Sequence, residues 1–123
     1  ALHLVEPLGF DVSDRTLKRA GLDYWQHVTV SVHRSFGALQ DAYPGARFWY
    51  TSKKAHVPYT QAKFHPDDFI VFGKETTGLP ADLLEANSGR SLAIPMFGPV
   101  RSLNLANAVS IVLYEALRQL RGF

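Results

Sequence analysis

Cysteine is absent from this 123-residue chain, and long apolar runs are absent as well. Without cysteine there can be no disulfide, no thiolate nucleophile and no cysteine-ligated zinc. Without a run of about 18 apolar residues, no transmembrane helix is predicted. No signal peptide is predicted, because the stretch 1–5 is too short and Glu6 and Pro7 follow it directly. A cytoplasmic location is the simplest prediction.

A strong net charge is also missing. Lysine and arginine number 13 against 11 aspartates and glutamates, which gives a net charge of +2. With 12% aromatic and 46% hydrophobic residues, this composition excludes a disordered chain and predicts one globular domain. The five histidines show no HxxxH or HExxH spacing, so no metal site is expected.

The charges are unevenly distributed along the chain. The stretches 41–66 and 89–123 each carry four basic residues against one acid, whereas 67–88 carries five acids against one lysine. Basic zones of this kind can follow the phosphates of a nucleic acid. They can equally be solvated surface charges, so the pattern alone leaves both interpretations open.

Strand-like and helix-like segments alternate. Short apolar or β-branched runs predict strands at 2–5, 28–32, 47–51, 69–72 and 92–95, and the run 69–72 is typical of a strand buried on both faces. Capping residues and helical spacing predict helices at 14–24, 35–42, 80–85 and 102–122. The alternation favours an α/β fold with a mostly parallel sheet flanked by helices.

The first candidate for chemistry is the loop 72–80, which follows a predicted strand and precedes a predicted helix. Ligands of α/β sheets bind beyond the carboxyl ends of strands. Gly73 and Gly78 allow sharp turns or close backbone approach, and Glu75 lies between them. The segment is neither a Walker loop nor a GxGxxG loop. An ordinary strand–helix turn with an exposed Glu75 is the alternative.

The second candidate is the segment 94–107, in which two prolines and a glycine lead into the last helix. Ser102 and Asn104 are both natural N-cap residues, but a helix needs only one. Capping therefore leaves Arg101 and one of these two polar residues unexplained. A helix N-terminus beside an arginine can bind an anion.

Taken together, 68–80 and 94–109 resemble the second and third motifs of the SPOUT superfamily of S-adenosylmethionine-dependent RNA methyltransferases. The stretch 17–25 is similar to the small members that 2′-O-methylate cytidine or uridine at wobble position 34 of tRNA. The resemblance implies a C-terminal trefoil knot, S-adenosylmethionine as cofactor, the tRNA anticodon loop as substrate and a homodimer. No DNA or membrane partner is expected.

The resemblance also implies roles for individual residues. Glu75, Ser102 and Asn104 would be catalytic. Cofactor binding would involve Tyr50, Thr51, Gly73, Ile94, Met96, Ser102 and Leu103. Candidate contacts to RNA phosphates are Arg15, Lys18, Arg19, Lys53 and Arg101, each of which could instead be simply solvated.

The family's first motif lies in an N-terminal strand–helix unit, with an asparagine and a catalytic arginine, and this sequence shows no counterpart. We therefore expect residues 1–123 to be a single SPOUT domain that is incomplete at its N-terminus. Two rival functions remain. One is an inactive module of the same fold that binds RNA or S-adenosylmethionine. The other is a nucleotide-binding α/β enzyme of another class, such as a flavodoxin-like domain, and the absence of a phosphate loop counts against it.

Overall fold

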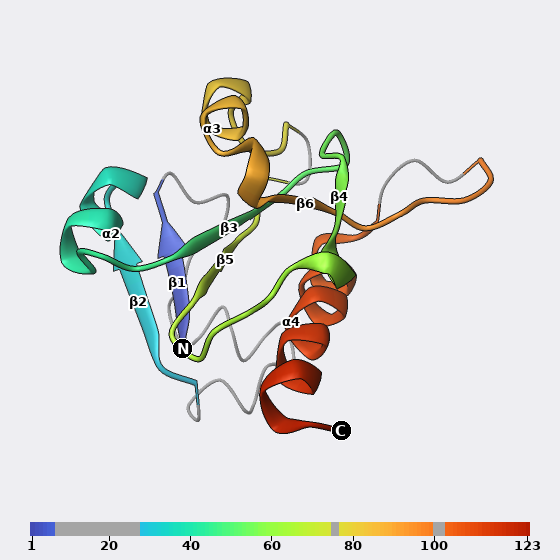
Figure 1. Ribbon diagram of the computed structural model, residues 1–123. Helices are drawn as coiled ribbons and strands as arrows, with labels where there is room; N and C mark the ends of the chain where they lie inside the picture. The colour runs from blue at the N-terminus through green and yellow to red at the C-terminus, as the bar shows by residue number, and fades with distance from the viewer. Residues whose placement is uncertain (7–27, 75–76, 100–102) are drawn as a thin grey trace, which may run out of the picture. The chain divides into compact units, whose positions relative to one another are not determined.

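The computed structural model describes residues 1–6, 28–74, 77–99 and 103–123. The chain divides into two compact units, Ala1–Gly45 and Ala46–Phe123 (Figure 1). The predicted α/β class with parallel sheets is confirmed, since the strand pairs of both units are parallel. None of the described helices is long and apolar enough to cross a membrane.

The first unit contains a parallel pair of strands, β1 (Leu2–Val5) and β2 (Val30–His33), followed by α2 (Phe36–Ala42). The helix begins where predicted, because the Ser35 side chain caps it by accepting a 3.0 Å hydrogen bond from the amide of Ala38. The second strand lies slightly later than the predicted 28–32. The helix predicted at 14–24 falls outside the described residues.

A histidine pair joins the two strands of this unit. His3 Nδ1 and His33 Nε2 are 3.0 Å apart, and the Tyr43 ring meets the His3 ring edge-on at 5.3 Å between centroids. Burial, with the nearby His33, lowers the pKa of His3. The neutral imidazole is therefore the form that this packing favours.

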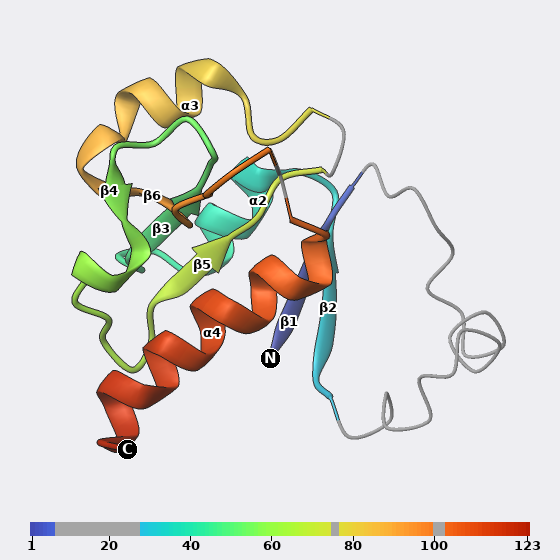
Figure 2. The same cartoon turned by 90° about the vertical axis from the view of Figure 1, so that its right-hand side faces the viewer.

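The second unit is built on a four-stranded parallel sheet with the order β4–β6–β3–β5 (Figure 2). Its strands are β3 (Phe48–Thr51), β4 (Val57–Pro58), β5 (Phe69–Val71) and β6 (Ser91–Ala93). Two helices, α3 (Ala81–Ala86) and α4 (Leu105–Arg121), accompany the sheet, with 3₁₀ turns at Tyr59–Gln61 and Ser88–Arg90. The short β4 and the turn after it were not predicted.

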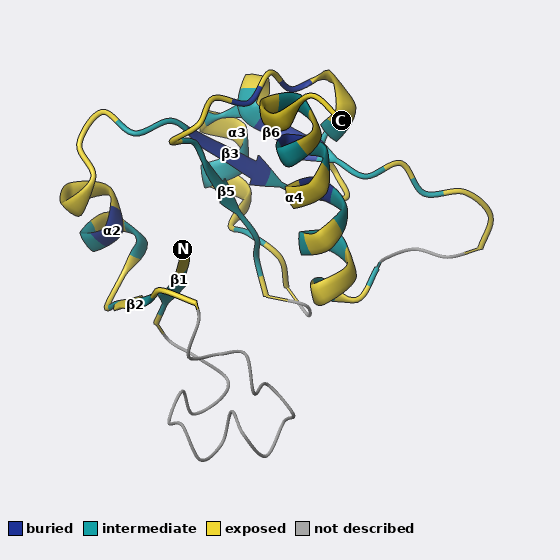
Figure 3. Ribbon diagram, turned by 90° about the horizontal axis from the view of Figure 1, so that it is seen from below, coloured by how far each residue is buried: buried dark blue, intermediate teal, exposed yellow. Residues whose placement is uncertain are grey.

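The core of the second unit lies between the sheet and α4. Trp49 and Leu92 from the sheet pack with Val112 and Ala116 from the helix. All three of Phe48, Trp49 and Tyr50 are buried, and β3 is the buried strand of Figure 3. The expectation that 69–72 is buried on both faces is wrong, because β5 is the last strand of this sheet and its residues are half-buried.

Asp68 ties the start of β5 to β3. Its side chain is 5% exposed and forms an ion pair with Arg47 at 3.0 Å. The same carboxylate accepts 2.8 Å hydrogen bonds from the indole Nε1 of Trp49 and from the His65 backbone amide. A buried carboxylate needs several donors of this kind, and here they set the register of the two strands.

Helix α4 has well-defined ends. The Asn104 side chain accepts a 2.8 Å hydrogen bond from the amide of Ala106, and Gly122 ends the helix in the left-handed conformation with φ 75°. The Gln119 amide donates to Ala62 O at 2.8 Å and accepts from Phe64 N at 3.0 Å. This clamp holds α4 against the chain that leads into β5.

Candidate active site

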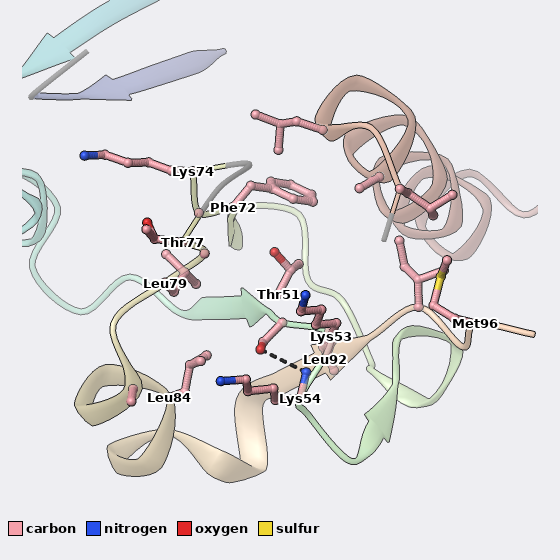
Figure 4. A pocket seen from close by; sticks show the side chains of 18 residues that line it. Thr51, Lys53, Lys54, Phe72, Lys74, Thr77, Leu79, Leu84, Leu92 and Met96 are labelled. Carbon is pink, nitrogen blue, oxygen red and sulfur yellow. Dashed lines mark hydrogen bonds between the residues drawn. The ribbon is translucent and has the colours of Figure 1, made fainter. Parts of the chain in front are cut away.

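A cavity of about 370 Å³ opens where three strands of the second unit end (Figure 4). Thr51 is the last residue of β3, Phe72 follows β5, and Ile94 follows β6. These three strands are neighbours and parallel, so their carboxyl ends meet at one edge. That edge is where α/β proteins place their ligands.

The walls of the cavity are largely apolar. Side chains from both candidate loops, from β6 and from α3 and α4 form them: Phe72, Leu79, Ala81, Leu84, Leu92, Ile94, Met96, Leu103, Leu105 and Ala108. Polar groups come from Thr51, Ser52 and Thr77. A mostly apolar cavity with a few convergent polar groups is typical of a small-molecule site.

Hydrogen bonds connect the strand ends on which the cavity rests. Thr51 Oγ1 donates to Val71 O at 2.9 Å, which bridges the ends of β3 and β5. Ser52 N donates to Leu92 O at 2.9 Å, and Ser52 Oγ accepts from Lys54 N at 3.1 Å. The spacing of the loops around the cavity is therefore set by β3.

Gly73 lies where the loop after β5 folds back on itself. A Cβ at this position would lie 2.3 Å from the carbonyl carbon of Gly78 and 2.4 Å from the amide nitrogen of Leu79. Gly78 N donates to Lys74 O at 2.8 Å and has φ +69°. Glycine is thus required at 73 by the loop's own backbone, whereas the resemblance pointed only to approach by a ligand.

Lysine side chains supply the charge at the cavity. Lys53, Lys54 and Lys74 all line it. In Figure 4 Lys53 lies beside Thr51 and Lys54 extends toward Leu84, whereas Lys74 extends away from the cavity. The ion pairs among the described residues, Arg47–Asp68 and Arg118–Glu115, involve none of these lysines. This part of the cavity can therefore attract an anionic group.

Most of the predicted cofactor residues meet at this cavity. Thr51, Gly73, Ile94, Met96 and Leu103 line it, as does Lys53, which was predicted to contact RNA. They lie in three separate loops, and they meet because each loop follows one of three neighbouring parallel strands.

Two predicted residues lie differently. Tyr50 is only 3% exposed and is not among the residues that line the cavity. Burial raises the pKa of its hydroxyl, and the charge of Arg90 opposes that shift. Asn104 is exposed and does not line the cavity, although Leu103 and Leu105 on either side of it do. Its side chain caps α4, so capping accounts for the position of Asn104.

The remaining predicted residues lie outside the described part of the chain: Arg15, Lys18, Arg19, Glu75, Arg101 and Ser102. Conversely, Lys54, Leu84 and Ala108 line the cavity without having been predicted. Lys54 directly follows Lys53, so the basic zone at 41–66 carried a signal for it. No sequence signal identified Leu84 or Ala108, because their positions depend on how α3 and α4 pack.

The sequence is similar to known proteins over most of its length. Residues 1–114 match the SpoU rRNA Methylase family. The tRNA (cytidine(34)-2′-O)-methyltransferase of Escherichia coli (strain K12) is 41% identical over 120 residues, a match that spans 97% of this chain and 76% of that protein.

Solved structures share the fold. One solved structure comes from work on the 2-OH methylation of C/U34 on tRNA. It superposes on this chain with a TM-score of 0.89 at 50% identity, over 98% of this chain and 79% of that one. The AdoMet-bound rRNA methyltransferase of Sinorhizobium meliloti gives a TM-score of 0.76 at 25% identity, over 96% of this chain and 45% of that one.

Proposed function

This chain belongs to the SpoU rRNA Methylase family, and we propose that it methylates the ribose 2′-hydroxyl of the nucleotide at wobble position 34 of tRNA, using S-adenosylmethionine. One observation carries the proposal. Thr51, Gly73 and Leu103 come from three different loops and line a single cavity at the carboxyl ends of three parallel strands. The names of the similar proteins indicate which nucleotide is the target.

The cavity suits the cofactor. Its volume of about 370 Å³ lies within the range of roughly 300–1,000 Å³ usual for small-molecule sites. Ile94, Met96 and Leu103 would make apolar contacts with the adenine ring and the aliphatic carbons of S-adenosylmethionine. Backbone groups near Gly73 would form hydrogen bonds with the polar atoms of the cofactor. A lysine such as Lys54 can pair with the carboxylate of the methionine moiety.

S-adenosylmethionine, when bound, would supply an electrophilic methyl group for the ribose 2′-oxygen. The protein's own task is to hold the ribose in line, and positioning of this kind supplies much of an enzyme's rate. Glu75, Ser102 and Asn104 would orient the ribose and the catalytic groups. The Asn104 side chain accepts a hydrogen bond from Ala106 N, which fixes it at the start of α4, next to Leu103 and Leu105 of the cavity.

Contacts to RNA phosphates would come from Arg15, Lys18, Arg19, Lys53 and Arg101. Lys53 is supported by its position, because it lines the cavity beside Thr51. The 2′-hydroxyl is both the group that is modified and the group that separates RNA from DNA, so DNA would not be a substrate. A cytoplasmic location is part of the same proposal, and a tRNA substrate supports it.

We further propose that residues 1–123 belong to one SPOUT domain, that its C-terminal half contains the trefoil knot, and that the protein is a homodimer. The dimer is supported by α4, whose residues Leu113 and Leu120 are 44% and 40% exposed although they continue its apolar face. An apolar face of this kind is a candidate for subunit contact.

The test is a methylation assay with labelled S-adenosylmethionine and a tRNA that carries cytidine at position 34. Matched controls are the same tRNA already 2′-O-methylated at that nucleotide, and rRNA. We expect label in the unmodified tRNA only, in a nucleotide that resists alkaline cleavage. Label on a base, or on rRNA alone, would contradict the proposal. Cofactor binding without any transfer would instead identify an inactive binding module.

A further inference from the structure

Phe97 is the most exposed large apolar side chain in the described part of the protein. Its exposed fraction is 85%, compared with 69% for Phe123 and 61% for Tyr114. It lies in the stretch 94–99 after β6, which extends away from the sheet in Figure 1. A ring this exposed gains little from the protein's own core and is open to stacking on a binding partner.

The segment that carries Phe97 is stiff and begins at the cavity. Pro95 and Pro99 restrict the backbone on either side, and Gly98 makes a turn with φ +74°. Ile94 and Met96 line the cavity, whereas Pro95 and Phe97 are exposed. The alternation directs Met96 to the cavity and leaves the ring of Phe97 to solvent, one residue further along the chain.

We propose that Phe97 stacks on an unpaired base of the tRNA anticodon loop, next to the nucleotide that enters the active site. This inference rests on the proposed tRNA substrate. Proteins recognise unpaired RNA bases by stacking them on exposed aromatic rings. The neighbouring cavity carries Lys53, which suits a phosphate of the same strand. Aromatic and basic groups together on one edge form a surface for single-stranded RNA.

A second copy of the chain fits this position less well. Protein–protein hot spots centre on an anchor that is ringed by further close contacts. Phe97 is flanked by Met96, which is half-buried at the cavity, and by Gly98, which has no side chain. A single base needs only one face of an aromatic ring, and the ring of Phe97 is exposed.

The experiment measures methyl transfer to an anticodon stem–loop RNA by the full chain and its variants. Phe97→Ala should raise the KM for RNA by roughly 5- to 100-fold, the effect of losing one stacked base, with the affinity for S-adenosylmethionine unchanged. Phe97→Trp should restore the KM, whereas Phe97→Leu should not, because leucine is apolar but has no ring. Phe123→Ala is the matched control and should leave the KM unchanged.

Removing the stacked base provides the second arm. Each loop base in turn is replaced by an abasic residue, and at one position the wild type and Phe97→Ala should become equal, as expected for two groups that interact. Equal KM values for the wild type and Phe97→Ala on intact RNA would overturn the inference while leaving the proposed function standing. A loss of mass in light scattering for Phe97→Leu or Phe97→Ala would overturn it in favour of a second copy. No transfer by the wild type would refute the proposed function itself.

Discussion

Gly73 packs so closely against Gly78 that a Cβ on Gly73 would lie 2.3 Å from the carbonyl carbon of Gly78. The contact closes the loop after β5 into a compact turn, with Gly78 N bonded to Lys74 O at 2.8 Å. The backbone of this turn forms one wall of the cavity. The shape of the wall therefore depends on the absence of a side chain at a single position.

Gly73→Ala should open the loop and weaken the binding of S-adenosylmethionine. Forcing a methyl group into closely packed backbone costs about 1–3 kcal/mol, part of which would appear as a lower free energy of unfolding. Gly89→Ala is the control, since a Cβ there meets nothing within 4 Å. Calorimetric titration measures the affinity, and equal affinities for the two variants would contradict this view of the loop.

Thr51→Val should loosen the junction between β3 and β5. The change keeps the shape of the side chain but removes the hydroxyl that donates to Val71 O, leaving a carbonyl beside the cavity without that partner. The expected cost in stability is about 1 kcal/mol, with weaker cofactor binding. Thr51→Ser retains the donor and should behave like the wild type in both thermal melts and titrations. A serine variant as weak as the valine variant would show that the methyl group matters instead.

Asp68→Ala should be strongly destabilising. The substitution leaves the Trp49 indole N–H and the Arg47 guanidinium without their buried acceptor, at a cost of about 2–4 kcal/mol. Asp67→Ala removes an exposed carboxylate one residue away and should change the free energy of unfolding little. Urea unfolding compares the two variants. Similar midpoints would mean that the Asp68 network does not hold the strands together.

Stability should fall in acid partly through Glu115. Hydrogen bonds from Arg118, and then from Gln119, lower the pKa of this carboxyl from 4.5 to about 2. A pKa that is lower in the folded state stabilises the protein above pH 4.5, and that contribution is lost as the pH falls toward about 2. Glu115→Gln should therefore flatten the slope of stability against pH in this window. Glu85→Gln, at an exposed position of α3, should not.

Asn104 tests whether capping and catalysis can be separated. Asn104→Ala removes the bond to Ala106 N and should cost about 1 kcal/mol, which a stable domain survives. Asn104→Asp keeps a capping oxygen and should preserve the melt. Both variants should lose methyl transfer, on the order of 100-fold if the ribose is misplaced by about 1 Å.

Ser110→Ala, on the exposed side of α4, serves as the control and should retain the activity. If the Asp variant kept both its melt and its activity, Asn104 would be a cap only. Ser102→Ala is tested by the same two measurements, and it should keep a cooperative melt while losing most methyl transfer to tRNA.

The sequence by itself determined the α/β class and the limits of the best-defined helices. Ser35, Asn104 and Gly122 act within a few residues of their own positions, so their capping roles could be predicted from local chemistry. The segments 72–80 and 94–107 were also identified in advance, because each follows a predicted strand and ligands of α/β sheets bind beyond the carboxyl ends of strands.

Tertiary structure alone decided which residues meet. Leu84 and Ala108 reach the cavity through the packing of α3 and α4, and Lys54 through the turn after β3. The apolar run 69–72 was expected to be buried on both faces, but β5 is the end strand of the sheet, and the interior strand β3 instead supplies Trp49 to the core against α4. Likewise, only the tertiary structure shows that position 73 must be glycine, because a side chain there would collide with the backbone of Gly78. Such contacts join residues that are far apart along the chain, so their distance in space cannot be read from the sequence. They form because the packing of the helices and loops against the sheet is energetically favourable.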